Sequence, residues 1–454
     1  MPMHDEKEAR KIVQESKKKK YVRGPLSHLN YALWSVLYRP YAYDESLPIL
    51  LPWFKYHNGN DDISRLNRAY IKQRQADGTW ILRLGLWPFL TMLRMLRETR
   101  RHWAMVSREY GVSLGRQILD QIKLILFYNL GPISYYECHL FKLKAGYEQH
   151  CRETKIFQLL DHVRPISKRQ SLDDKVAFIK TCLESGFPVP QTFAVGLAGQ
   201  WISPFIPKTG FPPPVDTVLK PANLALGYGF ELWEYRKEHD QWEREGDMLT
   251  REELLERCKS KKILYIMQER LINHSAIEMI SPTALATARL VTYKQSDEKI
   301  HVFHGFFRMG LGKTITNTSQ GELSSLIDLS TGSLLIARRA ENAEFDHHPD
   351  TGARITGLRL PFWEEVCQLA IDAHKKYSIA FIGWDVVFTP DGPYFLEANS
   401  GWGIDERFPI LKFFSAYFLE ALEKEEAETK PLRDPMEQSL RKLAWLSTHL
   451  AKKE

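Results

Sequence analysis

The stretch that decides the fold is FIGWDVVFTPDGPYFLEANSGWGID, residues Phe381 to Asp405. It predicts a strand, a turn and a second strand, because an apolar run is followed by the turn signal TPDGP and by further apolar residues. Asp385 falls on the first strand, and Glu397 and Asn399 fall on the second. Glu397 and Asn399 share one strand face, and the hairpin can fold Asp385 back towards them. These three residues are therefore candidate ligands for Mg2+, which prefers oxygen atoms.

A solvated strand face is the alternative for these carboxylates. The neighbouring residues argue against it, because Trp384, Val386 and Leu396 make the hairpin too apolar for a surface ribbon. A buried Asp and Glu need a partner, and a cation is the simplest one. The hairpin therefore favours a metal site.

Composition is that of an ordinary globular protein, with 454 residues, 44% hydrophobic and 26% charged. This length allows two or three domains. The net charge of +6 is unevenly distributed, because residues 1–150 carry 24 Lys and Arg against 14 Asp and Glu. The basic excess is scattered and no recognition motif accompanies it, so we expect no nucleic-acid binding.

The five cysteines show no CxxC or other metal-ligand spacing, and MPMHDEKEAR at the start lacks the apolar segment of a secretory signal. We expect a reduced, cytoplasmic setting. The apolar stretch Trp80 to Leu96 contains Arg83, Pro88 and Arg94, so no spanning helix is predicted. It is either an amphipathic segment at the inner face of an anionic membrane or a core helix pair broken at Pro88.

The common phosphate-binding motifs are incomplete. Gly312-Lys313-Thr314 would need glycine at 307 for a P-loop, but Phe307 stands there. Gly227-Tyr228-Gly229 begins a GxGxxG whose third glycine would fall at Leu232. Neither a P-loop nor a dinucleotide-binding fingerprint is present in the sequence.

The Asp, the hairpin and the Glu-x-Asn before Ser400-Gly401 resemble the metal-binding end of the ATP-grasp superfamily. The similarity is greatest to its sugar-transfer-associated family and covers roughly residues 155–421. It implies an α+β fold in which two α/β subdomains sandwich ATP after a helical, aromatic-rich N-terminal region. The expected parts are residues 1–150, 151–275, 276–424 and a C-terminal helix at 425–454.

The nucleotide site follows from the same resemblance. Lys175, at the start of a predicted helix, and Lys220, at the end of an apolar strand, match the family's two nucleotide lysines. Lys220 would bring a point charge to phosphate oxygens. Gly227 and Gly229 would let backbone N–H groups approach them. Taken alone, Lys175 is more simply an ordinary surface lysine, whereas Lys220 is equally well a strand-end residue.

The adenine hinge matches the strand end IMQERL, in which Gln268, Glu269 and Leu271 are the expected contacts. A buried strand end is the alternative. Glu278 is a weak candidate for the ribose contact. His274 corresponds to a histidine in this family, and a structural role is an equal alternative.

Two arginines stand within apolar strands, Arg289 in TALATARLVTY and Arg308 in HGFFRMG. An uncompensated guanidinium there would be costly, so each needs an anion. That anion is a substrate oxyanion, which makes both residues catalytic candidates, or an internal carboxylate. Related ligases carry an arginine two residues before the metal aspartate, where this chain has Gly383.

The resemblance implies an ATP- and Mg2+-dependent ligase that joins a carboxylate to an amine through an acyl phosphate. The family name suggests small-molecule or glycan-linked substrates, in cell-surface polysaccharide or natural-product assembly. Two alternatives stay open. One is an ATP-grasp kinase. The other is a membrane-surface binding protein with a vestigial ATP site.

Overall fold

The computed structural model describes residues 46–429 except 48, 56, 76–79, 152–154, 157–158, 160–171, 173, 223–228, 296, 313–321, 340–342, 404 and 406. The chain divides into two compact units. The helical unit is Val22–Val163 with Glu406–Glu454, and the α/β unit is Met1–Tyr21 with Arg164–Asp405. The Lys17–Lys20 run and most of the predicted C-terminal helix at 425–454 lie outside the described residues.

The helical unit carries the elements α3 (Asp62–Gln75), α4 (Trp80–Tyr110), α5 (Leu114–Lys123), η2 (Leu124–Tyr128), α6 (Pro132–Glu137), η3 (Leu140–Lys142), η4 (Tyr147–Gln149) and α13 (Ile410–Thr429). Ser113 begins α5 by accepting a hydrogen bond from the Arg116 amide. Helix α13 packs against α3 in this unit, whereas the sequence grouped residues 276–424 together. Phe418 is one of the buried apolar side chains of α13.

Helix α4 runs without interruption through Pro88. The interpretation of this stretch as a helix pair broken at Pro88 is therefore wrong. Proline removes one backbone hydrogen bond, and the leucine- and methionine-rich flanks are good helix formers on both sides. No helix in the described part of the chain is long and apolar enough to cross a membrane.

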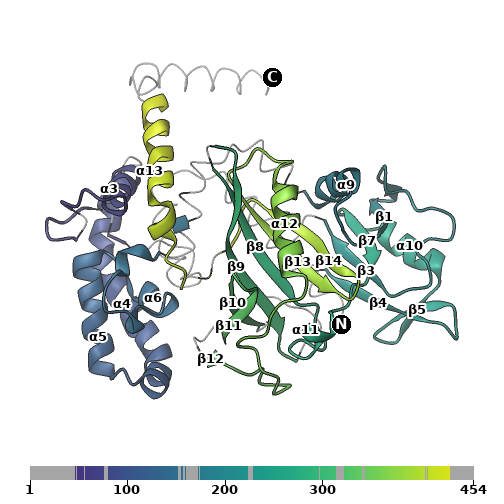
Figure 1. The fold of residues 1–454 in the computed structure, drawn as a ribbon, viewed down its shortest axis with the longest axis horizontal. Helices are drawn as coiled ribbons and strands as arrows, with labels where there is room; N and C mark the ends of the chain where they lie inside the picture. Colours follow the sequence, from purple (N-terminus) through teal and green to yellow (C-terminus); the bar gives the residue numbers. More distant parts are fainter. Residues whose placement is uncertain are drawn as a thin grey trace, which may run out of the picture. The chain divides into compact units, whose positions relative to one another are not determined.

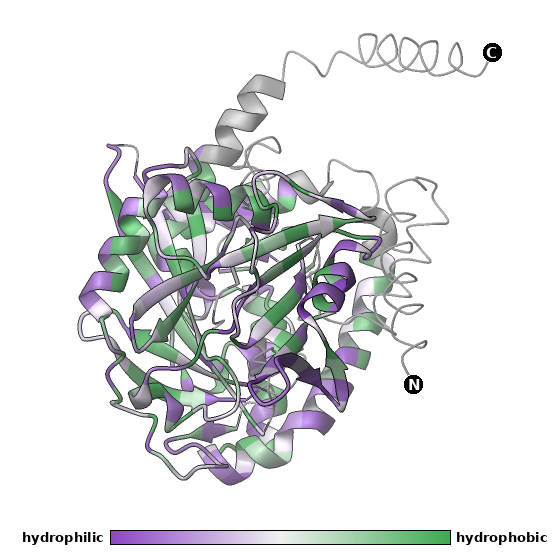
Figure 2. Cartoon of the chain, turned by 90° about the vertical axis from the view of Figure 1, so that its right-hand side faces the viewer, coloured by the Kyte–Doolittle hydropathy of each residue, from purple (hydrophilic) through white to green (hydrophobic). Residues whose placement is uncertain are grey.

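The α/β unit contains two antiparallel sheets (Figure 1). The first has the order β2-β1-β7-β3-β4-β5-β6, and its strands are β1 (Thr192–Leu197), β2 (Gln200–Trp201), β3 (Thr217–Pro221), β4 (Glu231–Arg236), β5 (Gln241–Arg244), β6 (Asp247–Leu249) and β7 (Tyr265–Glu269). Helices α9 (Lys175–Ser185) and α10 (Arg251–Lys259) accompany it in the sequence. Figure 2 shows hydrophobic residues along many of the strands and hydrophilic residues in many of the loops.

The second sheet has the order β12-β11-β10-β9-β8-β13-β14, and its strands are β8 (Thr287–Lys294), β9 (Ile300–Gly310), β10 (Glu322–Asp328), β11 (Ser333–Arg338), β12 (Glu344–Phe345), β13 (Phe381–Thr389) and β14 (Gly392–Asn399). Helix α12 (Trp363–His374) covers one face of this sheet, and α11 (Ser275–Glu278) precedes β8. The two-sheet architecture agrees with the predicted α+β class.

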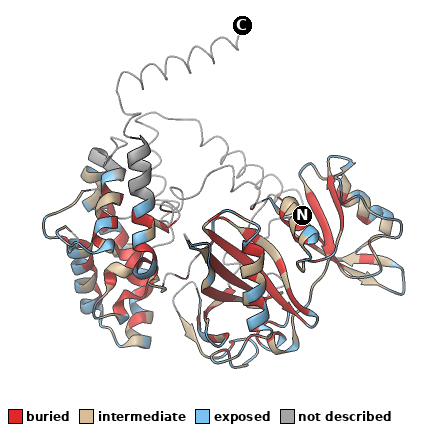
Figure 3. Ribbon diagram, turned by 45° about the horizontal axis from the view of Figure 1, so that its top comes forward, coloured by how far each residue is buried: buried red, intermediate tan, exposed pale blue. Residues whose placement is uncertain are grey.

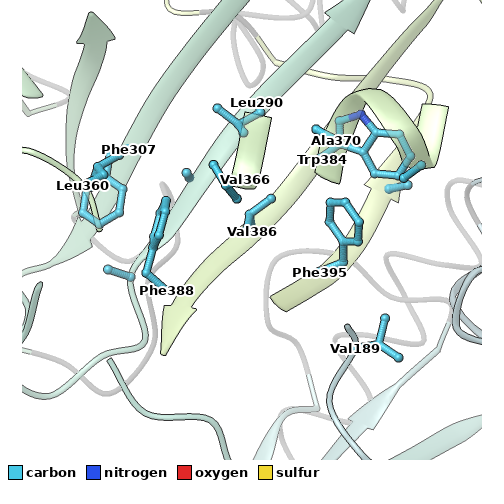
Figure 4. Packing of buried hydrophobic residues seen from close by; sticks show 14 of the residues in the cluster. Val189, Leu290, Phe307, Leu360, Val366, Ala370, Trp384, Val386, Phe388 and Phe395 are labelled. Carbon is cyan, nitrogen blue, oxygen red and sulfur yellow. The ribbon is translucent and has the colours of Figure 1, made fainter. Parts of the chain in front are cut away.

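The predicted hairpin is β13 and β14. All nine residues of β13 are buried, and Trp384, Val386, Phe388 and Phe395 pack in its core (Figure 4). Gly392 closes the turn at φ +123°, a conformation that favours glycine. The Phe395 amide donates to the Pro188 carbonyl, which ties the hairpin to the chain before β1. The hairpin is thereby held next to the first sheet.

Candidate functional site

Asp385, Glu397 and Asn399 come together at the β13–β14 hairpin. Asp385 and Glu397 are cross-strand partners, and Asn399 donates a 3.2 Å hydrogen bond from Nδ2 to Glu397 Oε1. Asp385 is buried, whereas Glu397 and Asn399 are partly exposed. The geometry therefore gathers the three predicted ligands, with the deepest one anchored in the core.

Both predicted lysines approach this carboxylate group. Asp174 caps helix α9 through hydrogen bonds to the Val176 and Ala177 amides, which places Lys175 in the first turn. Lys175 Nζ lies 3.2 Å from Glu397 Oε2. Lys220 comes from β3 of the other sheet, and desolvation lowers its pKa to about 8, while the nearby charges of Glu397 and Lys175 raise and lower it respectively. Residues from both sheets thus meet at Glu397.

Arg289 and Arg308 both bind Asp385. Arg289 makes a two-pronged contact, with Nε to Oδ1 and Nη2 to Oδ2 (2.8 Å), and Arg308 Nη2 donates to Oδ1 at 3.0 Å. Burial alone would raise the pKa of Asp385, but the two positive charges outweigh it and hold the pKa well below its ordinary value. The sequence left open whether these arginines bind a substrate oxyanion or an internal carboxylate, and in the structure both bind the internal carboxylate of Asp385.

Gly383, two residues before Asp385, is closely packed on its side-chain side. A Cβ on Gly383 would lie 2.4 Å from Trp402 Cβ, so a larger residue there requires Trp402 to move. The same Cβ would lie 3.2 Å from Cδ of Arg289. Arg289 of β8 therefore lies beside position 383, and its guanidinium reaches Asp385 from the neighbouring strand.

The donor set fits a hard divalent cation. No group of three His, Cys, Asp or Glu side chains in the described part of the chain could hold a metal. The candidate set instead combines two carboxylates with one amide oxygen, which Mg2+ accepts when water and phosphate oxygens complete the shell. A carboxylate offers about four lone-pair directions, so Asp385 can bind a cation as well as its two arginines.

The glycine loop is described only in part, because Gly227 lies outside the described residues. Gly229 has φ +75°, and a Cβ there would lie 2.6 Å from Tyr265 Oη and 2.9 Å from Pro221 Cγ. Tyr265 Oη also donates to the Gly229 carbonyl at 3.1 Å. Glycine is therefore required at 229 by packing and backbone shape, and its contact with phosphates stays a prediction.

The residues of the predicted adenine hinge lie at the end of strand β7, which agrees with the alternative of a buried strand end. Gln268 Nε2 donates to Thr192 Oγ1 at 3.0 Å, and Glu269 Oε1 accepts a 2.7 Å hydrogen bond from the Gln191 amide. Both side chains therefore join β7 to the beginning of β1. Leu271, the third predicted hinge residue, is half-buried and follows the end of β7. Adenine contact stays a prediction for all three residues.

His274 and Glu278 lie in and beside α11. His274 Nδ1 accepts the Ala276 amide at 3.1 Å, so this histidine caps the short helix, and its ring lies edge-on to Phe362. Glu278 is exposed. The structural role of His274 is thus visible, whereas the ribose contact of Glu278 stays a prediction.

A second polar group on the same sheet was not identified from the sequence. The Asp405 amide donates to His304 Nε2 at 3.3 Å, and Arg338 Nη2 lies 3.8 Å from Asp405 Oδ1. In the strand register, Ser324 of β10 lies opposite Arg338 of β11 on one side and opposite Arg308 of β9 on the other. The only signal for this group was Asp405 at the end of the hairpin segment, because its partners are 67 and 101 residues away.

The fold and this arrangement define an ATP-grasp protein. The family model for "Sugar-transfer associated ATP-grasp" matches residues 157–407, more than half of the chain, and the chain belongs to this family. Members of the ATP-grasp superfamily use ATP, typically with Mg2+. The family expected from the sequence is therefore confirmed.

The chain also matches solved structures of a ligase and a synthetase at low identity. D-alanine–D-alanine ligase from Bacillus anthracis has a TM-score of 0.31 and 11% identity, over 56% of this chain and 68% of that chain. N5-carboxyaminoimidazole ribonucleotide synthetase from Thermus thermophilus has a TM-score of 0.29 and 11% identity, over 51% and 46%. No curated protein matches the chain.

Proposed function

We propose that this protein is an ATP-dependent ligase that joins a carboxylate to an amine through an acyl phosphate. The observation that carries the proposal is the meeting of Lys175, Lys220 and Glu397, contributed by a helix and by both sheets, beside Asp385 and Asn399. Two cations next to a hard-metal donor set suit a polyphosphate and its magnesium ion. A lysine in an ordinary surface ion pair stays hydrated, whereas burial removes water from Lys220.

Each group has a role in the proposed reaction. Lys175 and Lys220 would hold the phosphates, and a bound magnesium ion would neutralise charge on them as the phosphoryl group moves. The substrate carboxylate would attack the γ-phosphorus, releasing ADP and forming an acyl phosphate. The amine would then attack the acyl carbon, lose a proton and displace inorganic phosphate, leaving an amide.

The two arginines would have different roles in the proposed reaction. Arg289 uses two nitrogens on Asp385 and would keep that carboxylate ionised and oriented. Arg308 is engaged there through one nitrogen, and its buried Nε has no protein hydrogen-bond partner among the described residues. Arg308 is therefore the better placed of the two to stabilise the oxyanion of a tetrahedral intermediate. The reaction needs no protein nucleophile, because positioning and electrostatics suffice.

Hydroxylamine trapping tests the ligase against the kinase alternative. The protein, Mg·ATP and a panel of small or glycan-derived carboxylic acids are incubated with hydroxylamine, which converts an acyl phosphate to a hydroxamate. We expect hydroxamate and ADP to appear together with at least one acid. ADP release with a phosphate ester and no hydroxamate would instead establish a kinase.

Lys220→Met is expected to weaken ATP binding by about 1.5–3 kcal/mol, the usual value of a hydrogen bond to a charged group. Calorimetry of the full chain measures it. Unchanged affinity would leave Lys220 with a structural role only. Lys180→Met, on the exposed side of α9, is the matched control.

Lys220 should also make ATP binding depend on pH. Its pKa is about 8 in the free protein, and phosphate oxygens favour the charged form, so ATP should raise that pKa. We therefore expect proton uptake on binding near pH 8 and falling affinity above it. Calorimetry in buffers of different ionisation enthalpy measures the uptake. Lys220→Arg should abolish it, because arginine stays charged.

A further inference from the structure

Helix α4 has its apolar and polar faces reversed. Phe89, Met92, Leu96 and Trp103 are 56%, 49%, 59% and 40% exposed. Their spacing puts them on one side of the helix. On the opposite side, polar residues such as Glu98 are buried. A helix facing water usually has the opposite arrangement, so its outer face is suited to an apolar environment.

Several of the buried polar side chains contact one another within the helical unit. Glu98 pairs with Arg97 and lies 3.5 Å from His102 Nε2. Gln121 Nε2 of α5 donates to Thr99 Oγ1 of α4 at 3.0 Å. These contacts hold α4 in place with Leu93 and Leu96 outward, and hydrogen bonding offsets part of the cost of burying the polar groups.

Helix α5 repeats the arrangement. Gln117 and Gln121 are fully buried, whereas Leu119 and Ile122 are 65% and 39% exposed. Both helices carry buried and exposed residues along their length, as Figure 3 shows for the helical unit. The reversal is thus a property of two adjacent helices and not of one side chain.

Positive charge borders the exposed apolar face of α4. Arg100 lies between Leu96 and Trp103 on the same side of the helix, and Arg97 and Arg101 flank it. All three are exposed or half-buried. Acidic residues are few here, because Glu98 points into the interior and Glu109 is paired with Arg108. The surroundings are therefore complementary to an anionic partner.

We propose that the outer face of α4 binds an anionic lipid bilayer at its surface. Phe89, Leu96 and Trp103 would enter the boundary between headgroups and acyl chains, and the arginines would contact lipid phosphates. A lipid surface suits this face because exposed apolar side chains and arginines lie together on it, and acyl chains and anionic headgroups meet at the surface of an anionic bilayer. The proposal does not depend on the ATP chemistry.

Vesicle flotation of the full chain tests the proposal. Vesicles of equal parts phosphatidylglycerol and phosphatidylcholine are compared with pure phosphatidylcholine, at low and high salt. We expect binding to the anionic vesicles at low salt, weakened by added salt. Equal binding to both vesicle types, or no binding to either, would overturn the proposal.

Variants then assign the contact to α4. The double change Phe89→Glu/Leu96→Glu should lower the partition coefficient more than about tenfold, because two apolar side chains no longer leave water. Arg100→Gln should lower it about fivefold. Ile206→Glu, at a 57% exposed apolar position in the α/β unit, and Lys299→Gln, at a 71% exposed side chain, are the controls and should change nothing.

Two further measurements separate lipid binding from a folding defect and from self-association. Circular dichroism of the double variant should match the wild type, since both positions face solvent in the free protein. Light scattering should give the same molar mass for both proteins. A wild-type dimer that the double variant converts to a monomer would assign the face to a second copy of the chain and overturn the lipid proposal.

Discussion

Glu397→Gln is expected to reduce turnover at least about 100-fold with the fold intact, because a charged ligand supplies several kcal/mol of transition-state stabilisation. Glutamine keeps the volume but loses the negative charge that pairs with Lys175 and would bind magnesium. The side chain is 28% exposed, so the change removes little core packing. ADP release at saturating ATP, titrated with Mg2+, measures the effect.

The control for this change is Glu184→Gln, which alters an exposed carboxylate at the far end of α9. It should leave turnover within about twofold of the wild type, because exposed pairs contribute little. Near-normal turnover by Glu397→Gln would refute the metal assignment. Equal losses in both variants would point to a general effect on α9 rather than to the site.

Arg289→Met should destabilise the protein by about 3–5 kcal/mol, the range for breaking a buried ion pair by removing one partner. Asp385 would keep its charge in the buried strand β13 with Arg308 as its only arginine partner among the described residues. Urea unfolding of the full chain, followed by tryptophan fluorescence, measures the loss.

A second variant separates the ion pair from simple packing. Arg289→Met/Asp385→Asn removes the buried charge as well, so it should be less destabilised than Arg289→Met alone. Arg359→Met breaks an exposed pair with Glu364 and should cost less than about 1 kcal/mol. If the double variant were the least stable of the three, the stabilising role of the Arg289–Asp385 pair would be wrong.

The local features of the site were predictable from the sequence. An apolar run followed by the TPDGP turn predicted the hairpin, because strand propensity and turn chemistry act over a few residues. Asp174 specified the start of α9 in the same way, through a cap to its own first turn. The same local patterns identified Asp385, Glu397 and Asn399 as one group. They also carried the family resemblance, which the family match confirmed.

The tertiary structure alone decided which anion the arginines bind. Arg289 and Arg308 are 96 and 77 residues from Asp385 in the sequence, and they meet it only because β9, β8 and β13 are neighbours in the sheet. Strand order depends on long-range packing, which no local pattern encodes. Burial of the polar side of α4 was also undecided in the sequence, since an amphipathic helix specifies two faces but not which one meets the interior.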